Sequence, residues 1–239
     1  MVIVKDKRRR GRTSPEGEAP PPRRRRMVPA DREQMIVAAA RRYFADHGLT
    51  GSTTELARRL EITQPLLYRY FPTKDALIAR VFDSLFPQDK SLEWEQLLDD
   101  AAIPLRERLK RFYQEFSHHV FTYEHVRLFL FSGLAKYEYN AQYYELLTKR
   151  LFHRIALGLR QHFAIDGARD DLLPVSAAEL ELVQSLHAAI YHVSFRRWVH
   201  TPGLTGDIDR LIDFKVDSFL DGAAATQSRL SNDWPAGTI

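Results

Sequence analysis

Polar and aromatic side chains that can contact DNA are concentrated in one short segment of this sequence. They are Gln64, Pro65, Leu66, Tyr68, Arg69 and Tyr70. Glutamine can bond bidentately to adenine, and proline and leucine can contact thymine methyl groups. Tyrosine hydroxyls can bond phosphate oxygens, which fixes a protein on the duplex without reading its sequence. Short amphipathic helices with mixed polar faces are common, so an ordinary surface helix remains the alternative from these residues alone.

A second group of residues has the types that bind metals. Glu115 precedes His118 by three residues, and His119 and His125 follow. This Glu-x-x-His spacing is typical of di-iron helical bundles, which also need a second such pair and two further carboxylates. The sequence contains no second pair. Surface or core histidines are therefore the preferred interpretation, and we expect neither a metal nor a cofactor.

Several sequence features exclude whole classes of protein. There is no Gly-x-Ser-x-Gly elbow, no phosphate-binding glycine loop and no His-Glu-x-x-His, so an enzyme is not expected. The absence of cysteine excludes disulfides and thiolate metal sites and suits a reducing cytoplasm. The first apolar stretch is too short for a signal peptide, and no later one is long enough to cross a bilayer. We expect a soluble, cytoplasmic protein that does not interact with membranes.

Positive charge is concentrated at the start of the chain. Residues 1–30 contain ten Lys/Arg and three Asp/Glu, within a formal net charge of +4 for all 239 residues. A basic segment of this kind can bind phosphates by releasing condensed counterions. It can equally be a solubilising or membrane-surface tail. Because the segment is rich in Arg, Pro, Gly and Glu, we expect residues 1–30 to be a disordered arm.

Helical periodicity begins directly after this arm. Asp31 followed by Gln34 resembles a capping box, and apolar residues at helical spacing predict a helix from about residue 32 to 47. Gly48 supplies its C-terminal stop. The predicted DNA-binding domain spans residues 31–80.

Three further N-caps follow within a few turns. Ser52 with Glu55 predicts a second helix, and Thr63 with Pro65 in the first turn predicts a third. Thr73 predicts a fourth. A helix, a tight turn and a second short helix make a helix-turn-helix, whose second helix enters the major groove.

That second helix should have one buried side. Leu67 and Phe71 lie four residues apart, so they should share a face that packs on the core of the domain. The polar residues would then lie on the opposite face.

The remainder of the sequence predicts long helices. Apolar stripes begin near Pro104, and further helices are expected at residues 143–163, 177–200 and 207–223, with a frayed tail from about Gly222. No strand-like alternation occurs. The fold class is therefore all-α, with a larger helical domain at residues 81–226 and a flexible tail at 227–239.

The stretch from Ile36 to Val81 resembles the DNA-binding head of the TetR family of transcriptional regulators. The resemblance rests on A-A-x-x-x-F at 39–44 and on I-T-Q-P-L-L-Y-R-Y-F-P-T-K-D-A-L at 62–77. It implies that Thr53 contacts phosphate and Thr54 reaches a base, although the segment before them is one residue short. It assigns base reading to Gln64, Pro65 and Leu66, and phosphate contacts to Tyr68, Tyr70 and Lys74. Glu61 replaces the usual turn glycine, so it should adopt left-handed geometry.

The same resemblance implies a repressor that binds a near-palindromic operator as a homodimer, through its last two long helices. It also implies an effector pocket among the aromatic-rich helices, for a small hydrophobic or aromatic molecule. The candidate lining residues are Phe112, Phe116, Phe129, Tyr144 and Tyr191, although simple core packing explains most aromatic residues here. The alternatives are a helical ligand-binding protein or enzyme without operator binding, and an activator or nucleoid-type binder.

Overall fold

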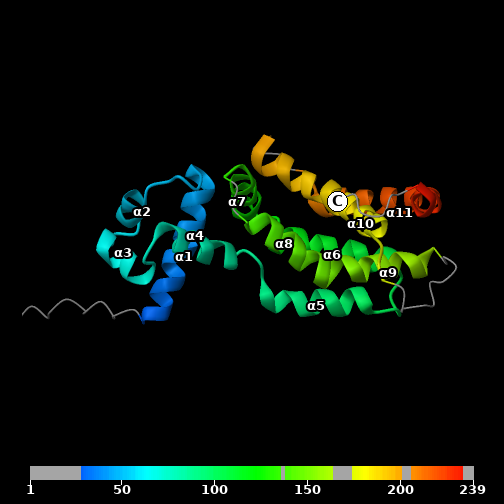
Figure 1. Ribbon diagram of the computed structural model, residues 1–239, viewed down its shortest axis with the longest axis horizontal. Helices are drawn as coiled ribbons and strands as arrows, with labels where there is room; N and C mark the ends of the chain where they lie inside the picture. Colours follow the sequence, from blue (N-terminus) through cyan, green and yellow to red (C-terminus); the bar gives the residue numbers. More distant parts are fainter. Residues whose placement is uncertain (1–27, 136–137, 164–173, 201–205, 234–239) are drawn as a thin grey trace, which may run out of the picture.

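Helices form the fold of this chain throughout the part that the computed structural model describes, which is residues 28–135, 138–163, 174–200 and 206–233. The predicted all-α class, with a small head and a larger helical body, is confirmed. The α-helices are α1 (Pro29–His47), α2 (Thr53–Arg59), α3 (Gln64–Tyr70), α4 (Lys74–Asp83), α5 (Gln88–Asp99), α6 (Leu105–His119), α7 (Tyr123–Leu134), α8 (Tyr139–Leu147), α9 (His153–His162), α10 (Ala177–Phe195) and α11 (Ile208–Asp233). Figure 1 shows α1 to α4 forming the head at one end of the molecule, with α2 and α3 farthest from α11.

The first helix begins earlier than predicted and lacks the predicted capping box. Pro29 lies in its first turn, where a missing N–H costs nothing, and Val28 is the N-cap without a side-chain bond. Asp31 therefore lies inside the first turn, where its charge is favourable to the helix dipole. Gly48 ends α1 as predicted, with a φ of 80°. The predicted arm lies outside the described residues as far as residue 27.

The other three N-caps of the head are confirmed. The side-chain oxygens of Ser52, Thr63 and Thr73 each accept a bond from the backbone N–H three residues later, at 3.4, 3.3 and 3.0 Å. Each cap satisfies one N–H that the helix itself cannot bond. These local bonds set the start of α2, α3 and α4, and so they set the length of the turn between α2 and α3.

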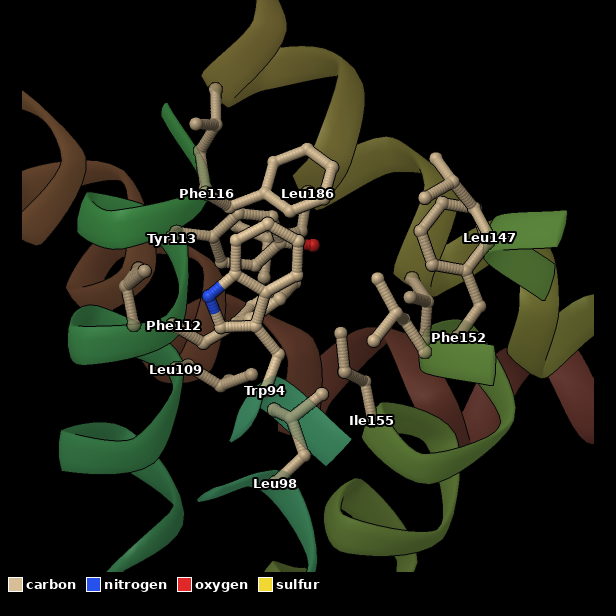
Figure 2. Close-up of a cluster of buried hydrophobic side chains, with 14 of the residues drawn as sticks. Trp94, Leu98, Leu109, Phe112, Tyr113, Phe116, Leu147, Phe152, Ile155 and Leu186 are labelled. Carbon is tan, nitrogen blue, oxygen red and sulfur yellow. The ribbon is translucent and has the colours of Figure 1, made fainter. Parts of the chain in front are cut away.

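Helix α5 was not anticipated from the sequence, and one tryptophan fixes it to the body. The indole of Trp94 is 1% exposed, and its ring centre lies 5.1 Å from that of Phe116 and 6.1 Å from that of Phe112. Figure 2 shows the indole of Trp94 pointing into the cluster, toward Phe112 and Tyr113. Its Nε1 donates to a carboxylate oxygen of Glu115 at 3.3 Å. The core of the body is therefore built around this side chain.

The long helices of the body largely follow the prediction. The helix predicted at 143–163 is one rod, in which a π-helical turn at Thr148–Phe152 joins α8 to α9. Helix α10 continues through a π-helical turn at Arg196–His200, as its predicted range requires. Helix α11 does not fray at Gly222 but extends to Asp233. None of the described helices has the length and apolarity needed to span a membrane.

Helices α6 and α11 are joined by a ladder of polar contacts. Side chains four residues apart on α6 meet aspartates four residues apart on α11, at donor–acceptor distances of 2.6 to 2.9 Å. The pairs are Arg106 with Asp217 and Asp221, Lys110 with Asp217, Gln114 with Asp213, and His118 with Asp209. Residue numbers rise along α6 as they fall along α11, so the two helices are antiparallel.

Candidate nucleic-acid interface and aromatic pocket

The turn between α2 and α3 has the geometry that the sequence predicts. Glu61 adopts a φ of 53°, in the left-handed region that usually requires glycine. Its N–H donates to the Arg58 carbonyl at 3.1 Å, and the N–H of Ile62 donates to the Ala57 carbonyl at 3.0 Å. These two bonds form a Schellman motif that satisfies the last carbonyls of α2. The motif fixes the angle at which α3 leaves α2.

Helix α3 is held to the head by its predicted apolar face. Leu67 is 1% exposed and Phe71 is 5% exposed, and both belong to the core of the head with Phe44 and Leu56. Burying two large side chains of this kind stabilises the placement of a helix of only seven residues. The face opposite Leu67 remains accessible to a partner.

The sequence-predicted DNA contacts differ in their exposure. Thr54, Pro65 and Arg69 are exposed. Five others are half-buried at the edge of the head: Gln64, Leu66, Tyr68, Tyr70 and Lys74. Thr53 is buried. The structure therefore brings eight of the nine residues to the surface around α3 and the start of α4, with Thr53 beneath them.

Thr53 connects the two helices of the motif. Its hydroxyl bonds the Tyr68 hydroxyl at 3.0 Å and accepts a bond from the Gln64 amide at 3.4 Å. The start of α2 is thereby joined to the first two turns of α3. In this arrangement Thr53 positions Tyr68 and Gln64, and Thr53 itself is 8% exposed.

Ion pairs neutralise part of the basic surface beside this site. Hydrogen bonds from Arg58 and Arg59 lower the pKa of the exposed Glu55 carboxyl to about 2, so this group is ionised at neutral pH. Arg59 also bonds the His47 ring at 3.1 Å. Glu55 therefore places a negative charge at the edge of the site. Arg69 lies exposed in the last turn of α3.

The head joins the body through α1 and α7. Arg127 Nε donates to the Ala45 carbonyl at 2.7 Å, and the Tyr123 hydroxyl donates to the Asp46 carboxylate at 2.7 Å. Leu128, from α7, is completely buried in the core of the head. A movement of α7 must therefore move α1.

The body contains a small pocket walled by rings, which we name the aromatic pocket. The space between its walls is too narrow for a water molecule, and those walls are Phe121, His125, Phe129, Tyr143, Tyr144, His187 and Tyr191. Three of the five predicted effector contacts, Phe129, Tyr144 and Tyr191, are among them. The other two, Phe112 and Phe116, are 0% exposed in the core around Trp94 and do not line this pocket. The structure brings the first three together and leaves the other two apart from them.

Sequence reasoning missed the two histidines of the aromatic pocket. His125 precedes Phe129 by four residues on α7, and His187 precedes Tyr191 by four residues on α10. This repeated spacing of a histidine and an aromatic residue could have indicated a shared wall, since residues four apart share a helix face. Burial lowers the pKa of each imidazole to about 3. The backbone of Leu85 raises the pKa of His125, but by less than burial lowers it. Both rings are therefore neutral at pH 7.

The histidines considered as metal ligands have different partners and do not share one site. His118 bonds Asp209 on α11, and His119 bonds the backbone carbonyl of Glu115. His125 lies on α7 within the aromatic pocket. In the described part of the chain, no three His, Cys, Asp or Glu side chains gather as a metal site would require.

Comparison with known proteins finds a family that matches the head and solved structures with a similar overall fold. Residues 36–81 match the family of bacterial regulatory proteins named the tetR family. The fold is similar to that of a TetR-like transcriptional regulator from Rhodococcus sp. RHA1, with 23% identity and a TM-score of 0.62 over 84% of this chain and 99% of that chain. It is also similar to a tetR-family transcriptional regulator from Streptomyces coelicolor, with 20% identity and a TM-score of 0.53 over 87% of this chain and 92% of that chain. Among curated proteins, none matches this chain in sequence.

Proposed function

We propose that this TetR-family transcriptional regulator is a repressor that binds a near-palindromic operator as a homodimer and is released by a small hydrophobic or aromatic effector. The observation that supports it most directly is the display of α3. Leu67 and Phe71 attach that helix to the head, while Gln64, Pro65 and Arg69 remain accessible. A helix held in this way can enter the major groove with its N-terminal residues against base edges.

The contacts of α3 suggest a division of roles. Gln64, Pro65 and Leu66, at the start of α3, read bases, and the exposed Thr54 reaches a further base. Tyr68, Tyr70 and Lys74 contact phosphates, and Arg69 strengthens the attraction to the backbone. Thr53 holds Tyr68 and Gln64 in place, because its hydroxyl bonds both.

The homodimer forms through α10 and α11. These helices pack on each other, and α11 presents Phe214, which is 62% exposed. A subunit contact on this face of α11 would remove that apolar side chain from water. A two-fold axis there places two copies of α3 on one face of DNA, roughly 34 Å apart or a multiple of it.

Helix α7 couples the effector to the operator. On one side it carries Leu128 and Arg127, which contact the head. On the other side it carries His125 and Phe129, which line the aromatic pocket. An effector that binds better to a shifted position of α7 favours a conformer with wrongly spaced heads, and so lowers operator affinity.

The direct test of this function uses two variants of α3 and the DNA that flanks the gene for this protein. Gln64→Ala should relax the preference at one base pair by about 1–3 kcal/mol and change little elsewhere. Tyr68→Phe should weaken binding to all sequences, because a phosphate contact carries no sequence information. Fluorescence anisotropy with single-base operator variants measures both effects.

Tyr113→Phe, in the core of the body, is the matched control and should leave DNA affinity unchanged. If the wild-type chain fails to bind this DNA, or binds every duplex alike, the repressor proposal is wrong. If Gln64→Ala weakens binding to all sequences equally, Gln64 does not read a base.

The dimer contact has its own test. Phe214→Asp places a charge at the centre of the proposed interface, so we expect monomers at micromolar concentration and operator affinity at least tenfold lower. Sedimentation velocity measures the mass in solution. Leu134→Asp, at a side chain that is 75% exposed near the end of α7, is the control and should leave the dimer intact. A Phe214→Asp protein that still sediments as a dimer would place the interface elsewhere.

A further inference from the structure

Three walls of the aromatic pocket carry buried polar atoms that have no hydrogen-bond partner among the described residues. They are Nδ1 of His187, the hydroxyl of Tyr143 and the ring nitrogens of His125. His187 is 3% exposed and Tyr143 is 4% exposed. A buried polar group in this state destabilises a protein. Several such groups on the walls of one pocket indicate that another molecule bonds some of them.

Water does not fit that role. The pocket is too narrow to hold a water molecule as it stands. An occupant therefore needs a side chain of the walls to move, and a single ring needs the smallest movement. The walls are ring faces and edges. His125 and Tyr143 have centroids 5.1 Å apart, and Phe129 and Tyr191 have centroids 5.9 Å apart. An aromatic ring is the shape that packs against such walls.

The charge of the walls selects against an ionised ligand. None of the residues that line the pocket is a lysine, arginine, aspartate or glutamate. Burial keeps the imidazoles of His125 and His187 neutral, because it lowers the pKa of each to about 3. A carboxylate would therefore lose its hydration without meeting a cation, which is costly in an apolar site. A neutral imidazole instead offers one donor and one acceptor.

We propose that the effector is an uncharged, single-ring phenol, whose ring stacks in the aromatic pocket and whose hydroxyl bonds His187 Nδ1 and the Tyr143 hydroxyl. A hydroxyl is the group that both donates and accepts, so it can satisfy an imidazole nitrogen and a tyrosine hydroxyl together. The inference rests on the proposed function, since it takes the body to be an effector-binding domain, and it names the chemical class of that effector.

The side chains around the pocket also offer a route to it. Tyr144 is 40% exposed, so rotation of its ring opens the pocket toward solvent. Phe121 lines both the aromatic pocket and a second, open pocket beside Trp198. Access therefore needs the movement of a ring and not the unfolding of a helix.

The test compares three ligands of one size on the full chain without DNA. p-Cresol carries a hydroxyl, toluene has no polar group, and benzoate carries a negative charge. Isothermal titration calorimetry should show p-cresol binding about tenfold or more tightly than either of the others. Equal binding of toluene, tighter binding of benzoate, or no binding of p-cresol would overturn the proposal.

A pair of isosteric variants then tests the named contact. Tyr143→Phe should weaken p-cresol binding severalfold and leave toluene binding unchanged. Tyr113→Phe is the matched control, because it also deletes a buried hydroxyl that lacks a partner among the described residues but lies outside the pocket walls. It should leave p-cresol binding as in the wild type. An equal loss in both variants, or a loss in neither, would show that Tyr143 does not bond the ligand.

The two proposals fail separately in these experiments. Selective binding of p-cresol by a protein that binds no operator would leave the ligand class standing and refute the repressor function. Operator binding by a protein that does not prefer p-cresol would refute the ligand class alone. Release of the operator by p-cresol, but not by toluene at the same concentration, would support both.

Discussion

Lowering the pH from 7 to 4.5 is expected to reduce the free energy of unfolding by several kcal/mol. The cause is the burial of His125 and His187 in the walls of the aromatic pocket, where both rings must stay neutral in the folded protein. Their folded-state pKa values are lowered to about 3, whereas an unperturbed imidazole titrates at 6.5. Between these two values the unfolded chain binds protons that the folded chain does not.

The sign of the effect follows from this difference in bound protons. Stability rises with pH between about 3 and 6.5 and is lost as the pH falls through that window. The slope approaches about 1.4 kcal/mol per pH unit for each histidine. Above pH 6.5 both states are neutral at these positions, and the histidine contribution becomes independent of pH. A proton on either ring also repels one on the other, which lowers the pKa of His187 further.

Urea unfolding followed by circular dichroism at pH 7.5, 6.5, 5.5 and 4.5, at constant protein and salt concentration, measures this slope. Replacing either histidine, as His125→Gln or His187→Gln, should remove about half of it. His162→Gln, at an exposed position on α9, is the matched control and should preserve the wild-type slope. A wild-type free energy that stays constant between pH 6.5 and 4.5 would contradict the prediction.

Replacing Trp94 by alanine is expected to destabilise the protein by about 3–5 kcal/mol, the range for deleting a large buried aromatic side chain. The indole is 1% exposed and its ring lies against those of Phe86, Phe112 and Phe116. Its loss would leave a cavity at the centre of the body and would remove the larger of the two apolar side chains, Trp94 and Leu98, that α5 buries there. The midpoint of urea unfolding, followed by circular dichroism, measures the change.

Two further variants separate packing from simple side-chain loss. Trp94→Phe keeps ring contacts and loses the bond from Nε1 to Glu115, so its effect should be less than half as large. Leu92→Ala removes an apolar side chain on the same helix that is 59% exposed, and it should change stability by no more than about 0.5 kcal/mol. A Trp94→Ala protein as stable as Leu92→Ala would show that α5 is not anchored by its tryptophan.

The head could be predicted from sequence because its signals are local. Ser52, Thr63 and Thr73 each cap a helix through a bond to the third residue beyond, and a contact at that range is visible in the sequence itself. Asp31 misled the prediction because it occupies a position equally suited to an N-cap and to a first turn. Pro29, which can begin a helix without its N–H, settled the choice.

The body was predicted less completely because its decisive contacts are distant in sequence. Helix α5 has no capping side chain at Pro87 and no long apolar stripe, so no local feature of the sequence predicted this helix. Gly222 suggested a stop, but α11 continues past it. Among the effector candidates, spacing could not distinguish Phe129, which reaches the aromatic pocket, from Phe112, which packs on Trp94. Which of these two side chains lines the pocket depends on how the helices pack against one another in three dimensions.

The polar ladder between α6 and α11 repeats at a regular spacing, so it does not by itself fix the position of α11 along its own axis. The aspartates of α11 recur every four residues, and so do its buried residues Ile212, Val216 and Leu220. Sliding α11 by four residues, about 6 Å, would give most side chains on α6 a new partner of the same kind and would lose contacts only at the ends. The repeat therefore determines which face of α11 meets the body but not its axial position. Phe214 would travel with the helix, so two alternative registers of α11 correspond to two discrete spacings of a dimer built on it.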